Sequence, residues 1–147
     1  MNIGKIKPTR YKKVKGKAWK ILSDYVRMRD FIIYRRCVSC GKTINDWKDG
    51  DAGHFISMGG HGALIGFNDD NVHLQCKFCN LSSSFHLGEP FESEIRRRGI
   101  DPDELRTLAT KSVKADEIFF LERLEDIYKK FQILKANYPN FDYPDYL

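Results

Sequence analysis

Apolar residues recur at helical spacing near the start of the chain. From about Lys17 to Tyr34 they fall three or four positions apart, which predicts an amphipathic helix with one face in a core. Residues 1–16 contain Pro8 and Gly16 and lack this period, so we expect a flexible basic arm before the helix. The apolar positions of the expected helix are Ala18, Ile21, Leu22, Tyr25, Met28 and Ile32.

The pattern changes over residues 37–80. This segment holds all four cysteines, three of the four histidines and seven of the 11 glycines. Helical periodicity is weak before Asn71. The composition therefore predicts short strands and loops around a bound metal, closed by one short helix.

Helical patterns return in the last part of the chain. Pro90 can open a short helix that Gly99 ends. Residues 101–104 then place Asp at an N-cap, Pro in the first turn and Glu at the capping-box position of a second helix. A long helix is expected over residues 115–137. Its buried stripe is predicted to be Ile118, Leu121, Leu124, Tyr128, Phe131 and Leu134.

Length and composition fit one globular α+β domain over residues 17–147, with a core at 37–88 and C-terminal helices over 90–137. Hydrophobic residues make up 41% of the chain and charged residues 31%, which is ordinary for such a domain. No apolar run approaches the roughly 20 residues that cross a bilayer. The N-terminus also lacks the apolar stretch of a secretory signal, so the expected location is the cytoplasm.

Positive charge is concentrated at the N-terminus. Eight of the 25 lysine and arginine residues precede Asp24, the first acidic residue, and the remaining 17 are outnumbered by 20 acidic residues. A basic arm on an acidic body favours contact with nucleic acid phosphates, although a solvated tail would have the same composition. The candidate DNA-binding residues are Lys12, Lys13, Lys15, Lys17, Arg96, Arg97 and Arg98.

The cysteines form two Cys-x-x-Cys pairs, Cys37 with Cys40 and Cys76 with Cys79. Two intervening residues let both sulfurs reach one tetrahedral ion at about 2.3 Å. Disulfides or a redox pair are the alternatives, but disulfides rarely persist in the cytoplasm and a redox motif needs no second pair. We predict a structural zinc ion, with Gly41 in the tight turn after the first pair. Four sulfur ligands leave such an ion no open position for catalysis.

Polar residues with catalytic chemistry lie between and beside these pairs. His54 is the candidate general base, expected at the end of a strand, that takes a proton from the water attacking phosphorus. Asn71, expected at the start of a helix, is predicted to pin the loop that carries His54. On one helix, His73 and Asn80 would be seven residues apart and face the same way. The candidate ligands of a catalytic Mg²⁺ or Mn²⁺ are His54, Asn80, Asp51 and His73.

These residues also carry a family resemblance. Residues 37–41, 51–55 and 67–80 resemble the NinG/Rap recombination endonucleases of lambda-like phages, a branch of the HNH superfamily. The resemblance implies a zinc-bound ββα-metal core and cutting of branched DNA, such as Holliday junctions or flaps, in the host cytoplasm. The residues themselves imply only phosphodiester hydrolysis. A homodimer would suit junction cutting, because paired nicks need two sites.

Two positions depart from the usual HNH pattern. Such nucleases have Asp directly before the first His, where this chain has Gly53. Either Asp51, bent toward the ion, or His73 is expected to take that place. Residues 82–86 follow Asn80 where such nucleases often have a Lys, and His86 in this segment is either an extra ligand or a surface residue.

Two other functions fit the same sequence. The chain could be a non-catalytic, zinc-stabilised DNA-binding module, in which the absent Asp before His54 marks lost activity. It could also be an interaction protein that recruits partners through its long C-terminal helix and the aromatic tail from Tyr138 to Tyr146.

Overall fold

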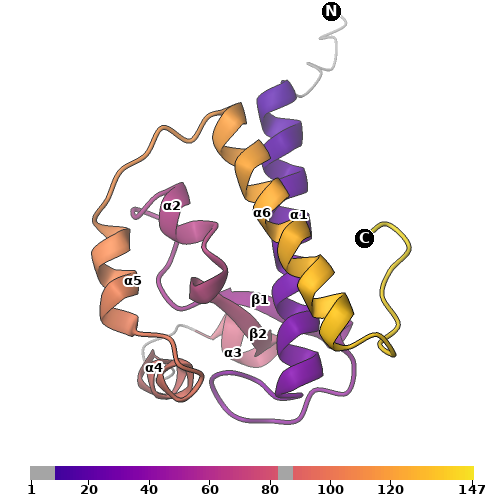
Figure 1. Ribbon diagram of the computed structural model, residues 1–147. Coiled ribbons are helices and arrows are strands. Elements are labelled where there is room, and N and C mark those ends of the chain that lie inside the picture. The colour runs from indigo at the N-terminus through magenta and orange to yellow at the C-terminus, as the bar shows by residue number, and fades with distance from the viewer. Residues whose placement is uncertain (1–8, 83–87) are drawn as a thin grey trace, which may run out of the picture.

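The structure, a computed structural model, describes residues 9–82 and 88–147 (Figure 1). It is a mixed α+β fold in which helices surround a small two-stranded sheet. The elements in chain order are α1 (Arg10–Ile33), η1 (Trp47–Asp49), β1 (Gly50–His54), α2 (Ala63–Gly66), η2 (Asp69–Asn71), β2 (Val72–Cys76), α3 (Lys77–Leu81), α4 (Gly88–Arg97), α5 (Pro102–Ala109) and α6 (Glu117–Asn137).

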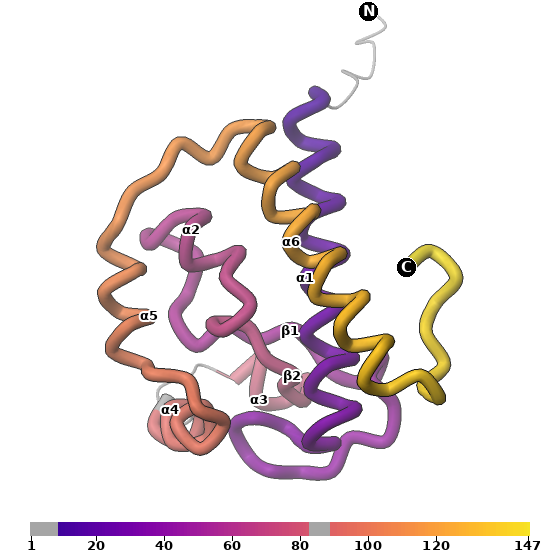
Figure 2. The backbone as a smooth tube through the Cα atoms, viewed as in Figure 1, coloured from indigo at the N-terminus to yellow at the C-terminus, as the bar shows by residue number. Residues whose placement is uncertain are grey.

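Helices α1 and α6 lie side by side and run in the same direction (Figures 1 and 2). Tyr11 meets Phe120 near their first turns, and Tyr25 meets Phe131 further along, with ring centroids 5.7 and 5.1 Å apart. Five of the six apolar positions predicted for the first helix are buried, namely Ala18, Ile21, Leu22, Tyr25 and Met28. The apolar pattern therefore identified the correct core face of α1.

The first helix starts earlier than the sequence predicted. Residues 10–16, expected in the flexible arm, form its first turns. The Thr9 side chain accepts a hydrogen bond from the Lys12 amide, and Arg10 forms an ion pair with Glu117 of α6 at 2.6 Å. These turns are thus held by a cap and by contacts with a distant helix, so a lack of local apolar period did not mean disorder.

The buried stripe of α6 differs from the predicted one in its first half. Phe120 and Ile127 are buried, whereas Ile118 is 64% exposed and Leu121 is 43% exposed. Leu124, Phe131 and Leu134 are buried as predicted. The prediction was wrong for Ile118 and Leu121. The helix has apolar residues on two neighbouring faces, and packing against α1 determines which face is buried.

The sheet pairs β1 with β2 in antiparallel register, from Gly50 opposite Cys76 to His54 opposite Val72. Residues 72–76, predicted as part of a helix, are therefore a strand, and the helix begins only at Lys77. Because side chains alternate along a strand, Ala52, His54 and Leu74 face α1, while Asp51 and His73 face the opposite side. This alternation decides which site residues can meet.

Helices α4 and α5 pack against the segment that carries the two cysteine pairs. Their apolar residues pack with Val38 and Ile65 in a second core cluster. The Asp101 side chain accepts from the Asp103 amide, so the predicted N-cap of α5 is confirmed.

None of the helices within 9–82 and 88–147 combines the length and apolarity that crossing a bilayer requires.

A buried charge cluster joins α1, β2 and α4. The Asp30 carboxylate accepts from Arg29 at 2.7 Å and from the Leu74 amide at 2.8 Å, and lies 3.2 Å from Arg98. Burial alone would raise the pKa of Asp30, but Arg29 and His73 outweigh it and hold that pKa well below its usual range. Asp30 is therefore a buried anion among cations.

Replacing Asp30 with alanine should destabilise the protein by about 3–5 kcal/mol, because two arginines lose their buried counter-charge. Urea unfolding of the zinc-loaded protein measures this change. Asp126→Ala is the matched control, since the Asp126 side chain is 53% exposed and, among the residues that the structure describes, pairs only with Arg123. Equal unfolding free energies for the two variants would contradict a structural role for the cluster.

Candidate functional site

The four cysteines converge on one point. Their Sγ atoms all lie within 4.8 Å of one another, and Cys40 Sγ and Cys76 Sγ are 3.9 Å apart. Sulfurs about 2.3 Å from a tetrahedral zinc ion are separated by roughly 3.8 Å. The cluster can therefore hold one zinc ion structurally, as the two Cys-x-x-Cys pairs predicted.

Backbone amides support this sulfur cluster. The Ser39 amide donates to Cys37 Sγ at 3.4 Å, and the Cys79 amide donates to Cys76 Sγ at 3.5 Å. Gly41 has a φ of +72°, a left-handed conformation that glycine adopts without steric cost. The tight turn predicted after the first pair is thus confirmed. The loops around the sulfurs are shaped for metal binding.

His54 ends β1 and is half-buried between α1 and the end of α2. Its Nε2 lies 2.9 Å from the Gly66 carbonyl oxygen, and its ring stacks on Trp19 at 5.1 Å with an interplanar angle of 9°. A carbonyl only accepts, so Nε2 carries the proton and Nδ1 is left as the basic nitrogen of the neutral ring. Burial lowers the pKa of His54, with a smaller opposing effect from Gly66. Burial therefore favours a neutral imidazole.

Trp19 is a site residue that the sequence did not reveal. It lies on α1, 35 positions before His54, and its stacking limits how the imidazole can turn. The only local signal was an aromatic residue inside an amphipathic helix, which is ordinary for a core position.

Asn71 is fully buried and holds two chain segments that follow His54. Its Oδ1 accepts from the Ile56 amide at 2.8 Å, while its Nδ2 donates to the carbonyls of Ile56 and Ile65 at 2.9 and 3.1 Å. It therefore fixes the segment that follows His54 and the residue before Gly66. Asn71 ends η2 and does not start a helix, so its predicted location was wrong although the predicted kind of contact is present.

Asp51 and Asn80 meet on the opposite face of the sheet. Asn80 Nδ2 donates to Asp51 Oδ2 at 3.0 Å, and both side chains reach solvent. A partly exposed carboxylate beside a side-chain amide suits Mg²⁺, which commonly binds one or two carboxylates together with water and substrate phosphates. His54 faces α1 instead, so the described residues do not bring it to this pair.

His73 does not join either group, which corrects the prediction that it faces Asn80. Its ring is 1% exposed, with Nε2 2.9 Å from the Asp70 carbonyl and Nδ1 3.2 Å from Asp30. Both ring nitrogens already have partners inside the protein. His73 belongs to the charge cluster because residue 73 lies on a strand, where helical spacing to Asn80 does not apply.

The space for a side chain at Gly53, directly before His54, is taken by a neighbouring residue. A Cβ added at Gly53 would lie 2.1 Å from Gln75 Oε1. The Gln75 side chain crosses over Gly53 and donates to Ser39 Oγ at 2.8 Å, which links the sheet to the first cysteine pair. No Asp fits at residue 53 while Gln75 holds this position.

The predicted DNA-binding residues divide into two groups. Lys12, Lys13, Lys15 and Lys17 are exposed along the first turns of α1. Arg98, in contrast, is 3% exposed at its side chain and pairs with Asp30 and Glu94, so it cannot contact DNA. Arg96 and Arg97 are exposed but pair with nearby acidic residues. His86 lies outside the described residues, as do Lys5 and Lys7.

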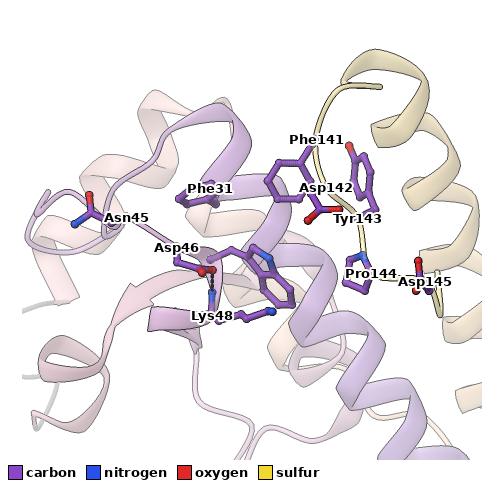
Figure 3. Close-up of a pocket in the computed structure, with 10 residues that line it drawn as sticks. Phe31, Asn45, Asp46, Lys48, Phe141, Asp142, Tyr143, Pro144 and Asp145 are labelled. Carbon is purple, nitrogen blue, oxygen red and sulfur yellow. Dashed lines mark hydrogen bonds between the residues drawn. The ribbon is translucent and has the colours of Figure 1, made fainter.

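A cavity of about 460 Å³ lies elsewhere, between residues 45–48 and the C-terminal segment (Figure 3). Phe31, Trp47 and Phe141 contribute to its walls, and none of the predicted catalytic or metal-binding residues does. The aromatic tail closes back on its own chain, with Tyr146 donating to Asp24 at 2.5 Å. Tyr138 is nevertheless 39% exposed and Tyr146 51% exposed, so the tail also presents aromatic side chains to solvent.

Comparison with known proteins gives one family. The sequence model described as Bacteriophage Lambda NinG protein matches residues 2–100. The matched region contains both cysteine pairs together with His54, Asn71 and Asn80, and it ends before α5. Neither the curated proteins nor the solved structures contain a significant match.

Proposed function

Because the chain belongs to the bacteriophage lambda NinG protein family, we propose that it is a metal-dependent DNA endonuclease of the HNH type. Its proposed substrates are branched recombination or replication intermediates, such as Holliday junctions or flaps. The observation that carries the proposal is the way His54 is held. A neutral imidazole, fixed at Nε2 and stacked on Trp19, has its Nδ1 available to take a proton.

His54 acts as the general base in this proposal. Nδ1 accepts the proton of a water molecule as that water attacks the phosphorus of the DNA backbone. The Gly66 carbonyl keeps the proton on Nε2 and so selects the tautomer that can accept at Nδ1. Trp19 and Asn71 are positioning residues, since one holds the ring plane and the other fixes the flanking backbone.

Asp51 and Asn80 are the residues that would hold the divalent ion. When bound, Mg²⁺ or Mn²⁺ supplies positive charge that stabilises the phosphate and the leaving 3′ oxygen. Hydrolysis in this way leaves a 5′ phosphate and a 3′ hydroxyl. A zinc ion in the four-sulfur site would have a separate role. It would tie α3, which carries Asn80, to the loop that carries Cys37 and Cys40.

The exposed lysines of α1 are proposed to bind the DNA backbone. None of Lys12, Lys13, Lys15 and Lys17 forms an ion pair within the described part of the chain. Their charges are therefore available to phosphates, and such contacts position DNA without reading its sequence. Trp19 follows these residues on the same helix, so bound DNA would lie near His54.

One observation favours a second function, a zinc-stabilised DNA-binding module without catalysis. His54 and the Asp51–Asn80 pair lie on opposite faces of β1, whereas hydrolysis needs base and ion at the same phosphate. DNA binding through the α1 lysines requires no such convergence. The two functions make different predictions for cleavage and the same prediction for binding.

A panel of duplex, flap and four-way junction DNA tests the proposal. The zinc-loaded protein is expected to cut the branched substrates faster than the duplex when Mg²⁺ is added, and to cut nothing without a divalent ion. Binding of all three substrates without cutting in Mg²⁺ or Mn²⁺ would favour the module instead. Analysis of the product ends for a 5′ phosphate checks the reaction class.

A further inference from the structure

Helix α3 presents two apolar side chains to solvent. Phe78 is 77% exposed and Leu81 is 81% exposed, and they lie about one helical turn apart. Every other phenylalanine within the described ranges is buried or half-buried. Cys79 is the buried residue of α3, so the four-sulfur site fixes this short helix and keeps Phe78 in place.

The patch is too small for a stable protein interface. Such interfaces bury roughly 800 Å² on each partner, whereas one aromatic side chain buries only about 150–250 Å². A nucleobase has the matching size, because one aromatic ring covers its flat face. The size of the exposed Phe78 ring thus matches a single base.

The surroundings of the ring also suit a nucleotide. Lys77 is exposed directly before Phe78, where its ammonium group can pair with a phosphate. An exposed apolar ring beside an exposed cation therefore matches the base and the phosphate of a nucleotide.

We propose that Phe78, with Leu81 beside it, stacks on one unpaired base of the DNA and so selects branched or interrupted substrates. Bases inside a duplex are covered on both faces by their neighbours, and only an unpaired base is free to stack on a side chain. This inference rests on the proposed function in needing DNA as the partner. It does not need cleavage.

Fluorescence anisotropy with zinc-loaded protein, without added Mg²⁺ or Mn²⁺, tests the inference. The probes are three DNAs of one sequence: a blunt duplex, the duplex with one bulged adenine, and the same bulge with an abasic residue. Wild type should bind the adenine bulge most tightly. Phe78→Ala should lower that affinity about 10-fold and leave the blunt duplex unchanged. Phe78→Trp should keep the preference.

Two controls separate stacking from other effects. Ile133→Ala removes another exposed apolar side chain, 62% exposed on α6, and should change none of the affinities. Lys77→Ala should weaken all three probes alike. Equal binding of the adenine and abasic bulges, or no loss in Phe78→Ala, would overturn the inference. A protein that shows the predicted preference but never cuts DNA would overturn the nuclease and leave base stacking standing.

Discussion

Replacing Cys79 with serine is expected to abolish the cooperative folding of the segment from Cys37 to Leu81. Zinc binding to small four-ligand sites contributes about 10–16 kcal/mol, which is as large as the whole stability of a typical domain, roughly 5–15 kcal/mol. The described sheet has two strands. The sulfur cluster joins the end of β2 and helix α3 to the loop that carries Cys37 and Cys40. Thermal unfolding by circular dichroism and zinc content per chain measure the effect.

Cys40 provides the matched comparison for Cys79. Cys79 is 2% exposed and Cys40 is exposed, so a packing defect should affect only the Cys79→Ser variant. If the metal is responsible, both variants lose zinc and both lose their unfolding transition. A Cys40→Ser protein with wild-type stability and one zinc per chain would contradict a four-sulfur structural site.

The parts of the fold that follow local rules could be predicted from the sequence. The two Cys-x-x-Cys pairs indicated one metal site because the spacing itself limits where the sulfurs can go. The N-cap of α5 depends on residues only two positions apart, and it forms as expected. The core face of α1 could be predicted from the helical spacing of its apolar residues, without knowing which segments pack against it.

The strand β2 shows why the rest could not be predicted. Val72 and Leu74 alternate with His73 and Gln75, which is a strand pattern, but all four side chains are buried. One face meets the apolar core of α1, and the other faces the charge cluster and the first cysteine pair. The sequence therefore indicated that a polar residue such as His73 was a metal ligand, whereas the structure buries it in the core.

Contacts between distant segments explain the remaining differences. Arg98 is internal because Asp30, 68 positions earlier, lies next to it. Trp19 and His54 meet only after α1 packs on the sheet, so neither residue indicates the other in the sequence. The side chain of Gln75, the diagonal neighbour of Gly53 on the paired strand, occupies the space that a side chain at residue 53 would take. None of these pairings has a local signature.

His54→Ala is expected to lower the rate of DNA cleavage by about 10²–10⁴-fold, the usual contribution of a general base. DNA affinity should stay unchanged, because the lysines of α1 are proposed to carry the binding. Thermal unfolding of the variant checks the fold, since the substitution also removes the contacts with Gly66 and Trp19. His61→Ala is the matched control, because His61 is exposed on the loop between β1 and α2.

Cleavage of a four-way junction tests the central claim most directly. Zinc-loaded wild type and His61→Ala should cut the junction in Mg²⁺, and His54→Ala should do so at least about 100-fold more slowly. A wild-type protein that binds the junction but leaves it uncut in both Mg²⁺ and Mn²⁺ would contradict the claim that His54 is the base of a nuclease.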